Sequence, residues 1–324
     1  MELLPVLAAR LSAEDGAIYD AFVERAGGAH YTQTRAWRSI ASAGKHVHST
    51  YFLAMDGGKA VGAAHVLRPA LGLVAGPVAF VERGPVCECP ADLARVLPLL
   101  AKALRRRGVL RLHVMPYLSG EEKSAAEHVL RENRFRDVQA NGGAHARTLR
   151  LDLRGDPFAG GERESLRRKL KQAEKAGVRA MRGKSSDVVA LALLYRQMMR
   201  QQSRPSKSRA YFDAVARFVD KGRGALFLSE QNGEAIAAAF VVHHAEIATF
   251  VLGASTIAQK PFSKMAPAMA EAVRWAKAEG CTAFDLGGLP RAGDRDPKRA
   301  QIAQFKLDFS KSPVDLVGEH ARWF

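Results

Sequence analysis

A lysine lies in an apolar setting near the end of the chain. The stretch "IAQFKLDF" predicts a helix with Ile302, Phe305 and Phe309 on one apolar stripe. Lys306 falls on the margin of that stripe, because it follows Ile302 by four residues and precedes Phe309 by three. An ammonium anchored there can stabilise negative charge that develops on a reacting oxygen. The alternative is an apolar stem that lies on the core with its ammonium in water.

Two aspartates close to this lysine in sequence are candidates for a general base. Asp285 lies at the end of a predicted strand just before Gly287-Gly288, and Asp308 follows Lys306 by two residues. The paired glycines allow a sharp turn and a close approach of the backbone to a ligand. Both aspartates also have structural explanations, as a turn former and as a charge on a helix surface. The sequence predicts no nucleophilic residue, because it contains no Gly-x-Ser-x-Gly motif and no cysteine in a basic setting.

A strongly basic helix is predicted upstream, in "ERESLRRKLKQAEKAGV". Leu166 and Ala173 belong to its apolar stripe, Glu164 and Arg168 form an i,i+4 pair, and Gly177 ends it. The basic residues cover the other faces, and most have no acidic partner at helical spacing: Arg163, Arg167, Arg168, Lys169, Lys171 and Lys175. They predict a surface that binds tRNA or other phosphates, with a solvated helix face as the alternative.

The elements that would position these residues occur twice. "FLAMDGGKAVGAA" from Phe52 and "FLSEQNGEAIAAA" from Phe227 each predict a strand, a turn containing glycine and a second strand. Downstream, "LLAKALRRRGVLRLHVMP" and "EAVRWAKAEGCTAFDLGG" each predict an amphipathic helix, a glycine stop and a strand. The copies are offset by about 175 and 172 residues, which indicates an internal repeat.

This order of elements predicts a mixed α/β fold with two tandem domains of the GNAT acyltransferase type, each built on a central mixed sheet. The length of 324 residues also favours two domains. The join falls near "LRGDPFAGGERES", where Asp156-Pro157 and Gly160-Gly161 break regular structure. We therefore predict an N-terminal domain of residues 1–155 and a C-terminal domain of residues 156–324 that carries the acyl-transfer site.

The charge balance indicates a polyanionic partner. The formal net charge is +16 and the pI is near 10.1, which is typical of proteins that bind nucleic acid, nucleotide phosphates or an anionic membrane. Three sparse cysteines and scattered histidines predict neither a disulfide framework nor a metal site. The opening residues do not predict a signal peptide, and the apolar runs are too short to cross a bilayer. We therefore expect a cytoplasmic protein.

Four segments taken in order resemble the FemABX family of aminoacyltransferases. They are "RGPV" at Arg83, "LRRKLKQAEKAGV", "KSRAYF", and "FDLGG" with "QIAQFKLDF". Members of this family are tandem GNAT-like proteins that use aminoacyl-tRNA to add amino acids to the stem peptide of peptidoglycan precursors. The resemblance runs from about Tyr31 to Phe309. The long helical hairpin inserted in some members is absent here, so the resemblance implies no tRNA contacts through such an arm.

The resemblance implies roles for particular residues. The family's Phe-Lys pair, whose lysine acts at the reaction centre, matches Phe305-Lys306 and makes Lys306 the catalytic residue. In the segment that contacts the acceptor nucleotide, Lys207 replaces the family's arginine and loses the bidentate fork. Either Arg38 or Lys45 matches the family's N-terminal basic residue. The implied substrate-binding set is Lys207, Arg209, Tyr211, Phe305, Gln33, Trp37, Arg38 and Arg83.

The resemblance implies transfer of an amino acid from aminoacyl-tRNA to an amine acceptor, the stem peptide of a peptidoglycan precursor. The aminoacyl-tRNA is a co-substrate, and no cofactor or metal is expected. Peripheral contact with the inner membrane surface is a further expectation.

Two alternatives remain open. An acyl-CoA-dependent N-acyltransferase would hold the CoA pyrophosphate on a glycine-containing turn at a helix start, and residues 259–265 at that position contain no glycine. A non-catalytic RNA-binding protein would explain the charge, although the sequence has neither an RRM-type nor a KH-type signature.

Overall fold

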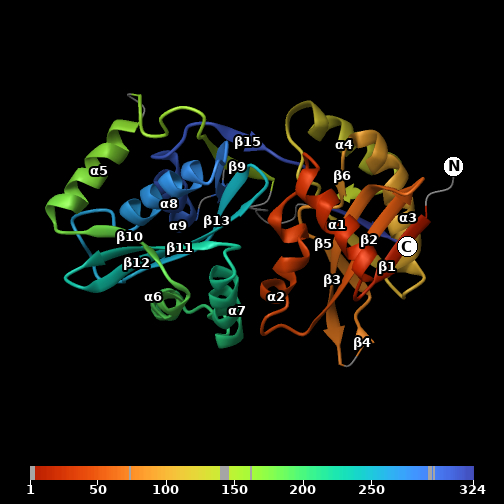
Figure 1. Cartoon of the computed structure of the whole chain (residues 1–324), viewed down its shortest axis with the longest axis horizontal. Helices are drawn as coiled ribbons and strands as arrows, with labels where there is room; N and C mark the ends of the chain where they lie inside the picture. The colour runs from red at the N-terminus through yellow and green to blue at the C-terminus, as the bar shows by residue number, and fades with distance from the viewer. Residues whose placement is uncertain (1–3, 73, 139–145, 161–162, 291–293, 295) are drawn as a thin grey trace. The chain divides into compact units, whose positions relative to one another are not determined.

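The chain groups into two compact units in the computed structural model, which describes residues 4–72, 74–138, 146–160, 163–290, 294 and 296–324 (Figure 1). The first unit comprises Met1–Arg147, Pro290–Gly293 and Val314–Phe324. The second comprises Thr148–Leu289 and Asp294–Pro313. By this division the last eleven residues group with the first unit, although Val314 and Asp315 belong to a strand of the second sheet. The sequence had predicted that everything after residue 155 belongs to the second domain. Gly161 of the predicted join lies outside the described residues.

The first unit is built on a sheet in the order β1-β2-β3-β5-β7-β16-β8. Its strands are β1 (Leu4–Ala8), β2 (Val47–Asp56), β3 (Lys59–Leu71), β5 (Val78–Val81), β7 (Arg111–Val114), β16 (His320–Trp323) and β8 (Arg136–Asp137). Two short strands, β4 (Val74–Ala75) and β6 (Val86–Cys87), pair with β3. β5 and β7 run parallel, and the other neighbours along this order are antiparallel.

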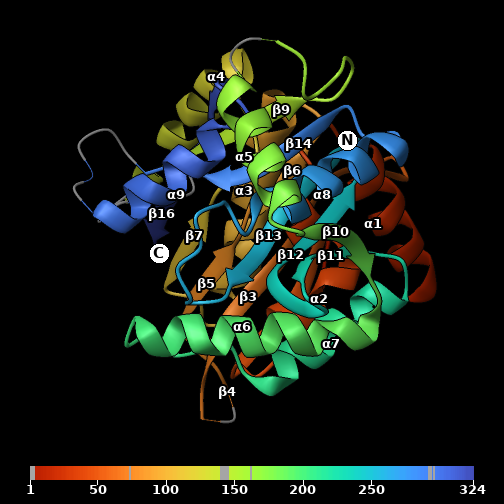
Figure 2. The ribbon, with the colours of Figure 1, turned by 90° about the vertical axis from the view of Figure 1, so that its left-hand side faces the viewer.

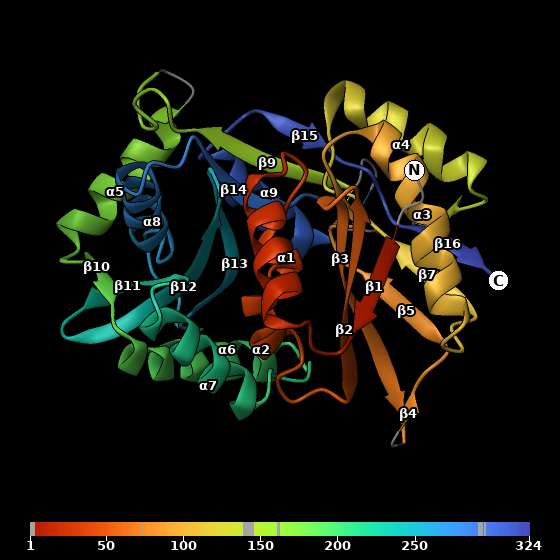
Figure 3. The ribbon, with the colours of Figure 1, turned by 45° about the vertical axis from the view of Figure 1, so that its right-hand side comes forward.

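Helices cover both faces of the first sheet. α3 (Pro90–Arg105) and α4 (Gly120–Glu132) lie on one face and α1 (Ala13–Arg25) on the other (Figure 3). Side chains alternate along β2, so Phe52 packs in the α3 core while Leu53 packs beside Phe22 of α1. Burial of each such side chain contributes roughly 1.5–3 kcal/mol. A short helix, α2 (Arg38–Ala41), follows the turns η1 (Tyr31–Gln33) and η2 (Arg35–Trp37).

The second unit repeats this order of strands, as β10-β11-β12-β13-β14-β9-β15. The strands are β9 (Arg147–Asp152), β10 (Arg179–Gly183), β11 (Ala225–Gln231), β12 (Glu234–His244), β13 (Ile247–Ser255), β14 (Ala283–Gly288) and β15 (Pro313–Asp315). β13 and β14 run parallel, as β5 and β7 do.

The helices of the second unit again lie on both faces of the sheet. α5 (Glu164–Lys175) and α8 (Ala266–Ala278) lie on one face, and α6 (Val188–Gln201) and α7 (Arg209–Asp220) on the other, with the turn η4 (Ser185–Asp187) before α6 (Figure 2). Phe227 and Val241 of the sheet pack with Met269 and Val273 of α8. α9 (Pro297–Leu307) precedes β15. Among the helices of the described residues, none is long and apolar enough to span a bilayer.

The sixth strand of each sheet departs from a simple duplication. In chain order, α4 is followed by β8 and β9, and α9 by β15 and β16. β8 lies in the first sheet and β15 in the second, but β9 inserts between β14 and β15, and β16 between β7 and β8. Each sheet is therefore completed by the strand that ends the other copy. This exchange explains why the C-terminal residues belong to the first unit.

Candidate active site

Lys306 is the buried residue of α9. Within Pro297–Leu307 it alone is buried, with 8% of its surface exposed. The expected apolar stripe is wrong for Ile302, which is 48% exposed. Phe305 and Phe309 do pack together, edge to face, with ring centroids 5.4 Å apart. The face that α9 turns inward therefore carries the lysine rather than Ile302.

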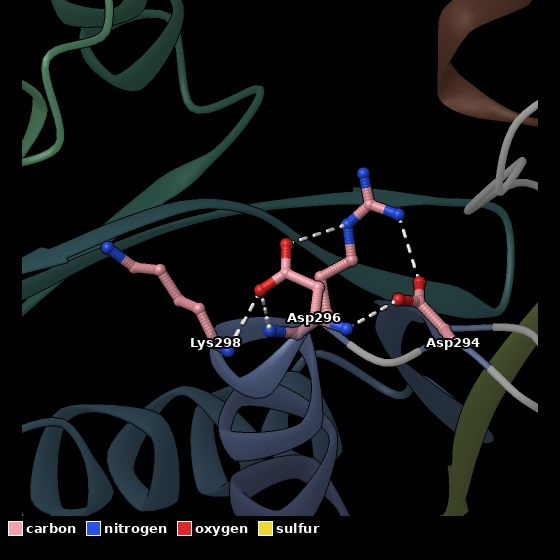
Figure 4. A network of polar contacts seen from close by, with 4 residues as sticks. Asp294, Asp296 and Lys298 are labelled. Atoms are coloured by element: carbon pink, nitrogen blue, oxygen red, sulfur yellow. Dashed lines mark hydrogen bonds and ion pairs between the residues drawn. The ribbon is translucent and has the colours of Figure 1, made fainter.

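The start of α9 is fixed by a polar network (Figure 4). The Asp296 carboxylate accepts hydrogen bonds from the backbone N–H groups of Lys298 at 2.9 Å and Arg299 at 3.3 Å. The Arg299 guanidinium also donates to the Asp294 carboxylate at 2.9 Å. The hydrogen bond that Asp294 accepts from the Asp296 N–H, and next the contact with Arg299, lower the pKa of the Asp294 carboxyl. Such a cap contributes about 1 kcal/mol. The Asp-Pro pair that signals this cap is visible in the sequence, although the sequence analysis did not use it.

The ammonium of Lys306 lies where two parallel strands diverge. β13 and β14 pair only from Ile247 to Thr249 and from Ala283 to Asp285, and both strands continue beyond that point. β14 shifts register against β9 after Asp285, and Gly287 adopts a φ of 81°. The Lys306 Nζ donates to the Gly288 carbonyl oxygen at 2.7 Å. A Cβ at position 287 would lie 3.5 Å from that nitrogen.

Burial changes the acidity of this ammonium. Loss of hydration lowers the pKa of Lys306 to about 8, and the nearby Asp285 opposes this shift. At pH 7, Lys306 is therefore protonated in roughly nine-tenths of the protein molecules. An ammonium with this pKa is a stronger hydrogen-bond donor than an ordinary lysine and gives up its proton more readily.

Asp285 is fully engaged in the fold. It is 2% exposed, and it accepts hydrogen bonds from the Thr148 hydroxyl and, at 2.7 Å, from the Gly287 N–H. The Arg150 Nε lies 3.8 Å from its other oxygen. The carboxylate therefore holds the glycine turn and balances the charge of Lys306, which favours the turn-forming explanation over a general base.

Asp308 anchors the basic helix α5 to the end of α9. Asp308 is 3% exposed and pairs with the ammonium of Lys169, so it is neither a surface charge nor a free base. The Arg163 Nε donates to the Phe309 carbonyl at 3.1 Å. These two contacts place α5 beside the turn that follows Lys306.

The predicted phosphate-binding surface on α5 is smaller than expected. Arg167 donates to the carbonyls of Phe158 at 3.0 Å and Gly160 at 2.9 Å, and pairs with Glu164 at 2.7 Å. Glu164 therefore pairs with Arg167 and not with Arg168. Three cations remain exposed without a partner among the described residues: Arg168, Lys171 and Lys175. Since they are three and four residues apart, they share one face of the helix.

The "KSRAYF" segment forms the start of α7. The Ser208 hydroxyl caps this helix by accepting from the Tyr211 N–H at 3.2 Å. The Lys207 ammonium lies 5.2 Å from the centre of the Tyr211 ring, and Tyr211 is 7% exposed. Arg209 points into solvent and lies 3.8 Å from Asp213. The structure thus brings Lys207 and Tyr211 together and separates Arg209 from them.

Gln33 lies inside the first unit. It has no exposed surface, and its amide donates to the Glu82 carbonyl and accepts from the His65 N–H at 2.8 Å. This position leaves Gln33 no surface for an acceptor and contradicts its expected contact with substrate. Arg38 donates to the Ala9 carbonyl at 2.9 Å, whereas Lys45 is exposed.

Aromatic rings gather around two other predicted residues of the first unit. Trp37 packs edge to face on Tyr31 at 4.6 Å, and Tyr31 contacts His30 at 4.1 Å. His30 also contacts Tyr117 at 4.6 Å, and the Arg83 guanidinium lies 5.4 Å from the centre of the Tyr117 ring. The sequence analysis missed His30 and Tyr117, because nothing in their local spacing links them to Trp37 or Arg83.

The start of α8 is closed to a diphosphate. The Ala266 N–H donates to the Ser263 hydroxyl at 3.3 Å, Pro267 has no N–H, and the Ala268 N–H donates to Ser229 at 3.0 Å. Lys264 folds back onto the Ala258 carbonyl at 2.8 Å. A helix start binds anions through free N–H groups, and Ala266, Pro267 and Ala268 provide none.

Comparisons with known proteins agree with this architecture. Residues 160–299 match the model of the acetyltransferase (GNAT) domain family. FemX shares 14% identity over 100% of this chain and 98% of its own, with a TM-score of 0.82. No protein of curated function matches the sequence.

Two further solved structures share the fold. The C-terminal domain of a putative lysylphosphatidylglycerol synthetase from Agrobacterium fabrum is 16% identical, covers 95% of this chain and 92% of its own, and has a TM-score of 0.63. A tandem GNAT protein from the clavulanic acid biosynthesis pathway is 12% identical, with coverages of 99% and 98% and a TM-score of 0.55. The predicted mixed α/β fold with two GNAT-like domains is confirmed, and so is the resemblance to FemX at the level of the fold.

Proposed function

We propose that the protein transfers an amino acid from aminoacyl-tRNA to an amine acceptor, the stem peptide of a peptidoglycan precursor, in the cytoplasm. The observation that carries this proposal is the ammonium of Lys306 at the divergence of β13 and β14. Among the described residues its one hydrogen-bond partner is the Gly288 carbonyl. An ammonium has three N–H donors, so two remain for a reacting oxygen.

The chemistry assigned to Lys306 follows from this position. The acceptor amine attacks the ester carbonyl, a C–N bond forms, and the C–O bond to the ribose breaks. Negative charge develops first on the carbonyl oxygen and then on the departing ribose oxygen. Lys306 stabilises this charge in a water-poor setting, and the ribose oxygen leaves with the proton that the amine loses. A donor of this kind contributes on the order of 10²–10³ in rate.

Proton removal does not need a carboxylate of this chain. The donors around Asp285 and the ion pair of Asp308 occupy both candidate bases. The attacking amine therefore passes its proton to the leaving ribose oxygen, directly or through water. This assignment predicts that replacing Asp308 affects the stability of the α5–α9 junction more than the chemical step.

The starts of the two central helices favour tRNA over acyl-CoA as the donor. The N–H groups that would hold a CoA pyrophosphate on α8 are taken by Ser263 and Ser229. In the first unit, α3 begins with Pro90 and carries Asp92 in its first turn, and a carboxylate there repels a diphosphate. The exposed cations of α5, which is tied to the turn after Lys306, would instead contact the tRNA phosphates.

The decisive experiment incubates the protein with mixed charged tRNAs and candidate acceptors, and identifies by mass spectrometry which acceptor gains which residue. The comparison is wild type, Lys306→Ala, and Lys298→Ala as a control on the exposed face of the same helix. Transfer by wild type and Lys298→Ala but not by Lys306→Ala supports the proposal. Acyl transfer from acetyl-CoA, together with a large rise in melting temperature on adding CoA, would instead support an acyl-CoA enzyme.

A further inference from the structure

The first unit contains a hollow that the proposed transfer reaction does not use. It lies between the end of α4, β8 and β16, and its volume is about 870 Å³. Ligand pockets typically measure about 300–1,000 Å³, so this hollow can take a ligand the size of a nucleotide. We call it the α4–β8 hollow, and define it by Arg131, Arg134, Arg136, His320 and Trp323.

Three guanidinium groups give this hollow a positive charge. Arg131, Arg134 and Arg136 are exposed and have no ion pair among the described residues. Two acidic residues, Glu127 and Asp137, also line the hollow, but Glu127 is paired with Lys123 at 2.8 Å. Guanidinium groups bind phosphate oxygens through paired N–H donors, which makes a phosphate the best-matched anion.

The backbone at Arg134 points to a role for its side chain. α3, α5, α7 and α8 are each followed by a glycine with positive φ: Gly108, Gly177, Gly222 and Gly280. At the end of α4 the same turn is made by Arg134, with a φ of 64°, and at the end of α6 by Ser203, with a φ of 52°. The Arg134 N–H donates to the Arg131 carbonyl at 2.9 Å. An arginine in this conformation costs about 1 kcal/mol relative to glycine. The guanidinium of Arg134 is thus held at the hollow by a turn whose conformation favours glycine.

A buried histidine is among the residues that line the hollow. His320 is 4% exposed, and its Nδ1 lies 3.0 Å from the Gly318 carbonyl oxygen. Since a carbonyl only accepts, Nδ1 carries the proton, and Nε2 of the neutral ring is left as an acceptor. Nε2 has no partner among the described residues.

An exposed indole completes the site. Trp323 is 67% exposed, and the Arg111 guanidinium lies 4.9 Å from the centre of its ring. The other tryptophans, Trp37 and Trp275, are 7% and 9% exposed. An indole held at the rim of a basic hollow offers a flat apolar surface on which a nucleobase can stack.

We propose that the α4–β8 hollow binds a nucleotide, either free or as one residue of an RNA strand. The phosphate lies on Arg131, Arg134 and Arg136, and the base stacks on Trp323. This site is independent of the transfer chemistry at Lys306. It joins phosphate recognition and base stacking in a single hollow.

The test uses the full chain and follows tryptophan fluorescence during titration with AMP. Saturable quenching is expected, because Trp323 is the exposed tryptophan. Arg134→Gly should weaken AMP binding about tenfold, as expected for loss of a charge-assisted hydrogen bond, while the melting temperature stays equal or rises. Arg10→Ala is the matched control, since Arg10 is an exposed arginine beyond β1, at the opposite edge of the same sheet. Lys306→Ala should bind AMP as wild type does.

Further binding measurements distinguish a free nucleotide from a nucleotide of an RNA strand. A tetra-adenylate that binds much more tightly than AMP assigns the site to an RNA strand, and equal affinities assign it to a free nucleotide. Trp323→Leu should weaken AMP binding in equilibrium dialysis. The proposal fails if inorganic phosphate competes as well as AMP, if Arg10→Ala weakens binding as much as Arg134→Gly, or if neither AMP nor tetra-adenylate saturates.

Discussion

The first and second units share one strand order but differ where their parallel strands separate. In the first unit β5 and β7 pair along their whole length, and the Met115 N–H then donates to the Gly84 carbonyl at 2.9 Å, which keeps the chains together. In the second unit β13 and β14 stop pairing after Thr249 and Asp285. At the same place in the fold the two strands therefore stay together in one copy and separate in the other.

The two units also bury different ionisable groups. In the first, His65 is 2% exposed, donates from Nδ1 to the Thr32 carbonyl at 3.0 Å and accepts from Ser49 at 2.7 Å. In the second, Lys306 carries a charge with one hydrogen bond. The last turn of α4 buries Val129 and Leu130, where the last turn of α9 buries Lys306. A buried neutral group whose hydrogen bonds are all made, such as His65, stabilises the fold. A buried charge with unused N–H donors, such as Lys306, indicates a functional site.

Loss of Lys306 should give the largest effect. If it gave none, the difference between the two units would not mark the reaction centre. Lys306→Ala is expected to reduce aminoacyl transfer by at least about 10²–10³-fold. The fold should persist, because the variant removes a charge that burial disfavours. Steady-state rates and melting temperatures of wild type, Lys306→Ala and Lys298→Ala check this. Full activity in Lys306→Ala would show that the point where β13 and β14 diverge is not the reaction centre.

The buried His65 should make the first unit sensitive to acid. Burial lowers the pKa of His65 to about 4, from 6.5 in the unfolded chain. Below pH 6.5 the unfolded state therefore binds the proton first, and stability falls by up to about 3 kcal/mol as the pH approaches 4. Chemical denaturation of wild type and His65→Gln at pH 7 and pH 4.5 measures this. An equal loss in His65→Gln would exclude His65 as the cause.

Lys306 should give a pH dependence of the same sign, in an alkaline window. Its pKa is lowered to about 8 from 10.5, so the unfolded state binds more protons between these values, and stability should rise as the pH increases from about 8 to 10.5. Catalysis by the ammonium should fall over the same range. The pH–rate profiles of wild type and Lys306→Arg test this, since arginine keeps its charge to higher pH. A wild-type rate that does not fall above pH 8 would contradict a role for the ammonium.

The exposed face of α5 should contribute a smaller, salt-dependent effect. Replacement of Arg168, Lys171 and Lys175 by alanine should weaken tRNA binding about tenfold or more and reduce the dependence of log K on log salt by up to about three. Filter binding at several salt concentrations measures both quantities. Arg167→Ala should instead lower the melting temperature, because Arg167 holds the Phe158–Gly160 turn. If the dependence of log K on log salt were unchanged in the triple variant, this face of α5 would not contact the tRNA.

The smallest expected effect concerns the cap of α9. Asp296→Ala should lower the free energy of unfolding by about 1 kcal/mol, since it removes the acceptor for two N–H groups at the helix start. Hydrogen exchange should rise at Lys298 and Arg299 while the last turn stays protected. Faster exchange at Lys306 as well would show that the cap also positions the lysine.

Local patterns in the sequence were sufficient to predict the repeated elements. The hairpins β2–β3 and β11–β12 and the helices α3 and α8 lie where apolar periodicity and glycine stops predicted them. These signals are short-range, because a strand or helix alternates its faces within a few residues. The chemistry of Lys306 was also readable as a hypothesis, from a cation set among Phe305 and Phe309.

Other features depend on contacts between segments far apart in the chain. The exchange of β9 and β16 is decided by pairing between strands that are far apart in the sequence. The local pattern of apolar residues does not predict such pairing. The sequence predicted Ile302 as buried and left Asp285 and Asp308 as possible bases. Only the packed structure turns α9 so that Lys306 faces inward, and supplies Thr148 and Lys169 to engage those carboxylates. The sequence by itself determined which elements form and which residue types they carry, and the tertiary structure decided which of those side chains lose water and which find partners.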